Sequence, residues 1–84
     1  MTIRQTIRRY MLENFLFTDA DSELQDDASF LTQGIIDSVG ALEITSFIEE
    51  TFQIRVQESE MLPENLDSVN NLVAFVERKQ AQPG

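Results

Sequence analysis

The residues best suited to chemistry in this chain are an adjacent aspartate and serine, Asp37 and Ser38, which follow a turn signal at Gly34. Glycine adopts backbone angles that a residue with a Cβ atom resists, so Gly34 predicts a turn. Asp37 has a side chain preferred at a helix N-cap, and its charge complements the positive end of the helix dipole. The pattern therefore predicts a loop that delivers Ser38 to the first turn of a helix.

The helix predicted for residues 38–52 has two different faces when successive residues are placed about 100° apart. The face expected to be buried contains Gly40, Ala41, Ile44, Phe47, Ile48, Thr51 and Phe52. The opposite face contains Ser38, Val39, Leu42, Glu43, Ser46, Glu49 and Glu50. This exposed face, a hydroxyl beside apolar side chains and carboxylates, is the candidate functional surface. The structural alternative is an ordinary helix cap followed by scattered exposed apolar residues.

Autonomous catalysis by Ser38 has little support in the composition. The chain contains no histidine and no cysteine, which excludes Ser-His-Asp and Cys-His catalysis and the usual zinc sites. Asp37 is adjacent, but an exposed carboxylate is a poor base for a hydroxyl at neutral pH. The segment also lacks the first glycine of the hydrolase nucleophile elbow. We therefore expect no catalytic or metal-ligating residue, and we interpret Ser38 as a site that another enzyme modifies.

The length and net charge of the chain limit the classes of protein to which it can belong. A chain of 84 residues predicts one domain, residues 1–84, with residues 80–84 as a loose tail. Fifteen acidic and six basic residues give a net charge of −9, which repels nucleic acid and steers basic protein surfaces toward the chain. No apolar run approaches the ~20 residues of a membrane span, and no signal peptide pattern begins the sequence. The expectation is a soluble, cytoplasmic monomer.

Two further helices are predicted at the ends of the chain. Thr2 and Gln5 fit a capping box, and the apolar face that follows contains Ile3, Ile7, Tyr10, Met11 and Phe15, with Arg4, Arg8 and Arg9 on the other side. Near the C-terminus, Asp67 or Ser68 caps a helix whose apolar positions follow the i, i+3, i+4, i+7 template. These positions are Val69, Leu72, Val73 and Val76.

The connecting segments predict one long loop and one short helix. The loop, residues 16–36, has apolar anchors at Leu16, Phe17, Leu24, Phe30, Leu31, Ile35 and Ile36. Its acidic residues, expected in solvent, are Asp19, Asp21, Glu23, Asp26 and Asp27. Residues 53–56 alternate like an extended connector, and Pro63 limits residues 58–66 to a turn or two of helix. The expected fold is an all-α bundle of three main helices and one short helix.

Four segments in order resemble the phosphopantetheine-dependent acyl carrier proteins. They are Asp26-Asp27-Ala28-Ser29-Phe30, Gly34-Ile35-Ile36-Asp37-Ser38-Val39, Ile48-Glu49-Glu50-Thr51-Phe52-Gln53-Ile54 and Pro63-Glu64-Asn65-Leu66-Asp67-Ser68-Val69. The resemblance implies that Ser38 carries 4′-phosphopantetheine through a phosphodiester, with an acyl or aminoacyl cargo held as a thioester on the terminal thiol. It also implies docking of a phosphopantetheinyl transferase, an adenylating ligase and downstream acyl-transfer or synthase enzymes. The docking residues it implies are Asp37, Val39, Leu42, Glu43, Glu49 and Glu50.

Gly40 separates two groups within this resemblance. Carriers of fatty-acid synthesis commonly have an acidic residue at this position. The run from Gly34 to Gly40 resembles more closely the stand-alone carriers that a separate adenylating ligase serves, including D-alanyl and other aminoacyl carriers. A housekeeping fatty-acid-synthesis carrier remains the first alternative, and an acidic helical interaction module without a prosthetic group is the second.

Overall fold

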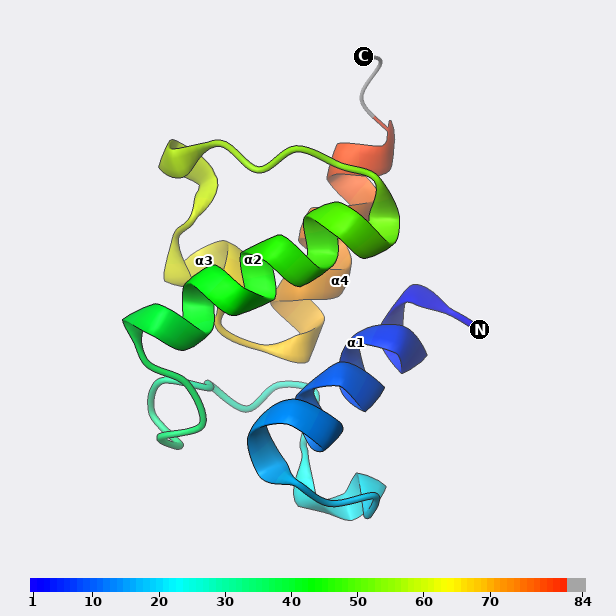
Figure 1. Cartoon of the computed structure of the whole chain (residues 1–84), viewed down its shortest axis with the longest axis vertical. Helices are drawn as coiled ribbons and strands as arrows, with labels where there is room; N and C mark the ends of the chain where they lie inside the picture. Colours follow the sequence, from blue (N-terminus) through cyan, green and yellow to red (C-terminus); the bar gives the residue numbers. More distant parts are fainter. Residues whose placement is uncertain (82–84) are drawn as a thin grey trace.

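The computed structural model describes residues 1–81, and in this range it consists of helices and loops without strands. The α-helices are α1 (Ile3–Met11), α2 (Ser38–Phe52), α3 (Pro63–Leu66) and α4 (Val69–Ala81). A π-helical turn η1 (Leu12–Leu16) continues α1, and two 3₁₀ turns are η2 (Asp21–Glu23) and η3 (Glu58–Glu60). Helices α1, α2 and α3 all contact α4, and α2 lies in front of it in Figure 1. The all-α prediction of three main helices and one short helix is confirmed.

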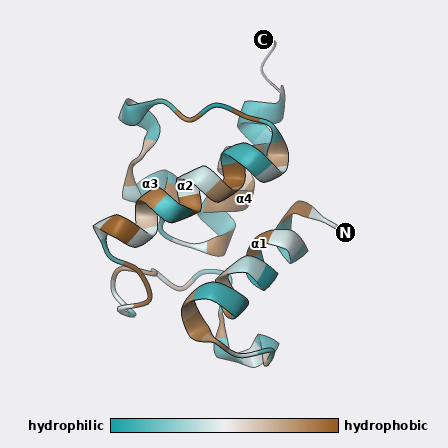
Figure 2. Ribbon diagram, in the orientation of Figure 1, coloured by the Kyte–Doolittle hydropathy of each residue, from teal (hydrophilic) through white to brown (hydrophobic). Residues whose placement is uncertain are grey.

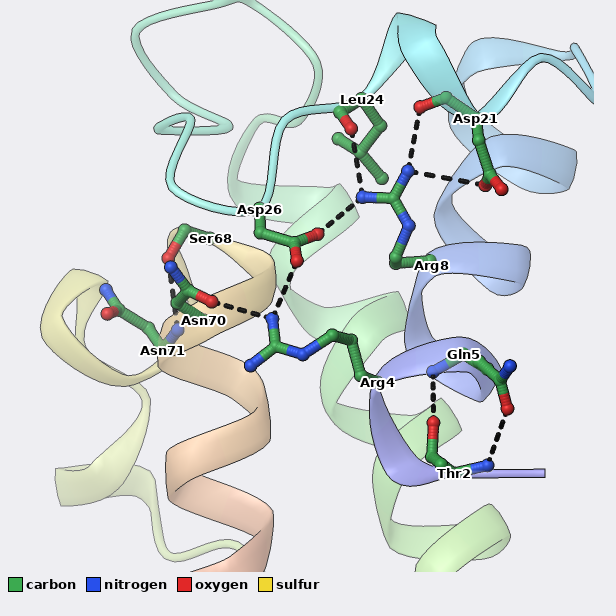
Figure 3. Close-up of polar contacts among 10 residues, drawn as sticks. All are labelled: Thr2, Arg4, Gln5, Arg8, Asp21, Leu24, Asp26, Ser68, Asn70 and Asn71. Carbon is green, nitrogen blue, oxygen red and sulfur yellow. Dashed lines mark hydrogen bonds and ion pairs between the residues drawn. The ribbon is translucent and has the colours of Figure 1, made fainter.

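Helix α1 begins with the capping box that the sequence predicts, but it ends in a π-helical turn that the sequence does not predict. Gln5 N–H donates to Thr2 Oγ1 at 3.1 Å, and Thr2 N–H donates to Gln5 Oε1 at 2.9 Å, which completes the capping box (Figure 3). Ile7 and Met11 are buried on the predicted apolar face. The π-helical turn ends at Phe17, a left-handed residue with φ 54°. Phe17 is 81% exposed and Leu31 is 49% exposed, so the prediction that both anchor the loop was wrong.

Helix α4 lies at the centre of the core. Ser68 is its capping residue, because Ser68 Oγ accepts from Asn71 N–H at 3.1 Å. The predicted apolar positions of α4 are all buried, and Phe75, which the four-position template omits, is buried with them. The helix continues through Ala81, so residues 80 and 81 are not a loose tail. The rest of the predicted tail lies outside the described residues.

Helix α2 buries one face, with one error in the prediction. Gly40, Ile44 and Ile48 are buried as expected, but Thr51 is exposed and Thr45 is buried in its place. The Thr45 hydroxyl donates to the Ala41 carbonyl at 2.9 Å, so its burial leaves no polar group unpaired. Figure 2 shows hydrophobic stretches in α1, α2 and α4, as expected of helices that share one core.

An aromatic row joins α1 and η1 to α2. The Tyr10 and Phe47 rings stack with centroids 3.8 Å apart, and Phe15 meets Tyr10 edge-on at 5.8 Å. Phe15 also approaches the start of α2, because a Cβ atom built on Gly40 would lie 3.2 Å from Phe15 Cε1 and 3.0 Å from Ile36 Cβ. The row therefore sets how closely α2 approaches the first helix.

The long loop is held by the arginines of α1 rather than by apolar anchors alone. The half-buried Asp26 carboxylate accepts from Arg4 at 2.9 Å and also from Arg8, so the prediction that Asp26 lies free in solvent was wrong (Figure 3). Arg4 also donates to Asn70 Oδ1 at 2.7 Å, and Arg8 donates to the Leu24 carbonyl at 2.9 Å. The polar side of α1 thus connects the loop to the start of α4.

Candidate functional site at the start of helix α2

Ser38 is the first residue of α2, and its side chain is exposed. Asp37 is the N-cap, because its Oδ1 accepts from Gly40 N–H at 2.9 Å and its backbone is extended. Gly34 has φ +70°, the left-handed conformation that favours glycine, so the predicted turn is confirmed. Local sequence signals therefore place the serine hydroxyl at the positive end of a 15-residue helix.

The loop that enters α2 is fixed to the junction of α3 and α4. Phe30 is fully buried, and its N–H donates to the Asp67 carbonyl at 2.8 Å. The Phe30 carbonyl in turn accepts from Ile35 N–H at 2.8 Å, which closes the turn that contains Gly34. Ile36, also buried, then packs against the first turn of α2. Ser38 is therefore presented from a closed and anchored turn.

A small cleft of about 140 Å³ adjoins Ser38. It is lined mainly by apolar residues from the entering loop, the first turn of α2 and the α3 region: Leu31, Ile36, Asp37, Ser38, Ala41, Met61, Leu62, Pro63, Leu66 and Asp67. The sequence analysis did not assign Leu31, Met61 or Leu62 to the site. The available signal was the apolar pair before Pro63, but nothing in the sequence showed that it faces Ser38.

The exposed face of α2 contains most of the predicted docking residues. Val39 is 61% exposed and Leu42 is 57% exposed, and Glu43 and Glu50 are exposed beside them. Neither glutamate forms an ion pair within residues 1–81. These four residues line one shallow groove, which also contains Tyr10, Ser46 and Phe47. The structure thus brings apolar and acidic side chains together on the Ser38 side of the helix.

Two residues, Glu49 and Tyr10, make the composition of this exposed face differ from the prediction. Glu49 is half-buried, and its Oε2 accepts from Val56 N–H at 3.0 Å, so this carboxylate already stabilises the connector after α2. Tyr10, predicted on the apolar face of the first helix, packs against the core and also lines the groove. Burial raises the pKa of Tyr10 above 10.0, and the nearby charge of Glu43 raises it further. The phenol therefore stays neutral at physiological pH and adds no charge to the groove.

Alternative classes of site find no support in the described part of the chain. Within residues 1–81 no group of three or more acidic, histidine or cysteine side chains is arranged to hold a metal ion. No helix in this range combines the length and the apolar character needed to cross a membrane.

Comparison with known proteins defines the class. Residues 5–76 match the family described as "Phosphopantetheine attachment site". Proteins called "D-alanyl carrier protein" from Streptococcus pyogenes serotypes M5 (strain Manfredo), M49 (strain NZ131) and M1 are each 34% identical to this chain over 80 residues. These alignments cover 95% of this chain and 98% of each relative. The chain belongs to the phosphopantetheine attachment family. It is a carrier protein whose prosthetic group is covalently attached 4′-phosphopantetheine.

The start of α2 suits such a group on structural grounds. Ser38 is exposed. A phosphate at this position is favoured by the positive end of the helix dipole. The apolar cleft beside Ser38 offers a surface for the part of the group next to the serine.

Proposed function

We propose that Ser38 is the attachment residue and that the protein carries an aminoacyl group, with D-alanine as the cargo. The observation that carries the attachment is the exposed Ser38 hydroxyl at the start of α2, within the matched family region. The names of the relatives support the cargo. When attached, the prosthetic group supplies a terminal thiol that holds the cargo as a thioester.

The residues around Ser38 position the hydroxyl and do not activate it. Asp37 holds the first turn through Gly40 N–H, so the Ser38 oxygen has a fixed place on the surface. The chain contributes no histidine or cysteine to transfer a proton. We infer that the transferase supplies the base for attachment and that the carrier is not itself an enzyme.

The names of the relatives favour an aminoacyl cargo over a long acyl chain. Gly40 also stands where carriers of fatty-acid synthesis commonly have an acidic residue. Within this proposal the fatty-acid-synthesis carrier is the less favoured alternative.

We further propose that partner enzymes dock on the exposed side of α2, on Asp37, Val39, Leu42, Glu43 and Glu50. The apolar pair supplies contact area, and the unpaired carboxylates attract basic residues of the transferase, the ligase and the downstream acyl-transfer or synthase enzymes. Glu49, which the resemblance also implicates, contributes by holding the connector through Val56. The net charge of −9 favours a monomer that does not self-associate, which we place in the cytoplasm.

Intact mass after incubation with a broad-specificity phosphopantetheinyl transferase and coenzyme A tests the attachment. The wild-type chain and the matched control Ser46→Ala, which alters another exposed serine of α2, should both gain the arm. Ser38→Ala should stay unmodified while its circular dichroism spectrum is unchanged. Modification of Ser38→Ala would overturn the assignment.

Loading of the modified protein tests the cargo. A D-alanine-activating ligase with ATP should add one alanyl group, which hydroxylamine removes because a thioester is labile to it. A malonyl transferase with malonyl coenzyme A should give little product. Efficient malonyl loading together with failure of the ligase would return the protein to fatty-acid synthesis.

A further inference from the structure

Asp67 forms a connection between the loop that enters α2 and the junction of α3 and α4. Its Oδ1 accepts from Leu31 N–H at 2.9 Å, its Oδ2 accepts from the Ser29 hydroxyl, and its carbonyl accepts from Phe30 N–H at 2.8 Å. Ser29 Oγ also accepts from Thr32 N–H at 3.1 Å. One residue therefore fixes three consecutive loop residues, and the helix cap that Asp67 might have formed is left to Ser68.

These bonds lead directly to the surface around Ser38. The Phe30 carbonyl, held in place by the bonds on either side of it, accepts from Ile35 N–H just before α2. Leu31, whose N–H is bound by Asp67, lines the cleft with its side chain about half exposed. The same cleft is lined by Met61, Leu62 and Pro63, which are close to Asp67 in the chain. Asp67 thus joins the loop side of the cleft to the segment that contains α3.

We propose that Asp67 is a positioning residue for the modification of Ser38. It orients the loop so that Leu31 stands beside the serine as a fixed part of the surface that the transferase recognises. This inference rests on the proposed attachment at Ser38. It concerns residues other than Asp37 and the exposed face of α2, which are the docking surface that the sequence analysis gave.

The expected effect is on recognition of the carrier and not on the chemistry of transfer. Ser38 remains at the start of α2 without Asp67, because its helix is capped by Asp37. Asp67→Ala removes the carboxylate bonds to Leu31 N–H and the Ser29 hydroxyl and keeps the backbone bond from Phe30 N–H. Leu31 is then held less firmly, and it must be ordered each time the transferase binds. Asp67→Ala should therefore raise the KM for the unmodified carrier about tenfold and leave kcat within about twofold.

Two further variants separate positioning from a general loss of stability. Asp67→Asn should restore the KM to within about threefold of wild type, because its oxygen accepts from Leu31 N–H and its amide donates to Ser29 Oγ. Asp26→Ala is the matched control, since it removes the pairs with Arg4 and Arg8 from the same loop at a site that does not line the cleft. It should leave the KM unchanged at a temperature where all variants are folded.

Leu31→Ala tests whether the Asp67 carboxylate acts through Leu31. This variant remains informative if Asp67→Ala does not fold. It should raise the KM about as much as Asp67→Ala, and the double variant should be no worse than either single variant. Equal effects of Asp26→Ala and Asp67→Ala, or additive effects of Asp67→Ala and Leu31→Ala, would overturn the proposal. Normal KM values for both Asp67→Ala and Leu31→Ala would overturn it as well. Failure of the attachment assignment is distinguishable, since Ser38→Ala would then be modified.

Discussion

Gly40→Ala, at the start of α2, should change the free energy of unfolding in two opposite ways. Glycine within a helix is destabilising by about 0.5–1 kcal/mol relative to alanine, so the exchange alone would raise stability. The new Cβ atom, however, would lie 3.0 Å from Ile36 Cβ and 3.2 Å from Phe15 Cε1. Ile36 Cβ is bonded to the backbone and cannot rotate away, so the loop itself must shift. Overpacking of this kind costs about 1–3 kcal/mol.

The overpacking term is the larger, and we expect Gly40→Ala to lower stability by about 1 kcal/mol. For a domain of this size that corresponds to a fall in Tm of about 4–8 °C. Urea denaturation of Gly40→Ala, Phe15→Leu and the double variant should reveal coupling, because Phe15→Leu removes one of the two clashing atoms. A higher Tm for Gly40→Ala, or strictly additive effects, would show that α2 does not approach Phe15 and Ile36 this closely.

Three other predictions concern α2 and its neighbours. Ile48→Ala should cost about 2–5 kcal/mol in a denaturant titration, since Ile48 is fully buried. Leu42→Ala, at a 57% exposed site, should cost about 0.5 kcal/mol or less; equal losses would mean that the helix faces are misplaced. Glu43→Lys combined with Glu50→Lys should slow association with the transferase about tenfold at low salt, measured by stopped flow, and added salt should shrink the difference. A defect confined to dissociation would assign the docking to the apolar residues instead. The unfolded Tyr10 phenol ionises before the folded one as pH rises, because the folded pKa is raised above 10.0. Stability should therefore fall above pH 10, and Tyr10→Phe should reduce that fall.

The parts of the fold that depend on local signals were predictable from the sequence. The capping box at Thr2, the N-cap at Asp37 and the turn at Gly34 each involve residues a few positions apart, so their spacing alone specifies them. Thr51 was misplaced because a helical wheel gives the angles between residues but not the direction of the partner helices. The sequence does not show where the neighbouring elements lie relative to α2, and in the folded chain Thr45 is buried whereas Thr51 is exposed.

The candidate site also combines features that local sequence predicts with features that depend on distant segments. Ser38 and its exposure follow from the helix start, whereas the cleft is formed by segments that meet only in the folded chain. The sequence offered Asp67 or Ser68 as the cap of the last helix. Ser68 forms the cap, because the Asp67 carboxylate binds Ser29 and Leu31, residues more than thirty positions away. Asp26 was placed in solvent for the same reason, because its cationic partners lie on α1.

Part of the loop before Ser38 is held by a residue late in the chain, and this has a consequence for incomplete chains. The α1 arginines bind Asp26 without that residue, but the bonds of Ser29, Phe30 and Leu31 require Asp67. A released chain that ends before Pro63 contains Ser38 but lacks these bonds. Such a truncated chain should therefore accept the arm slowly in a pulse with transferase. Modification would then favour chains that include α3 and the start of α4.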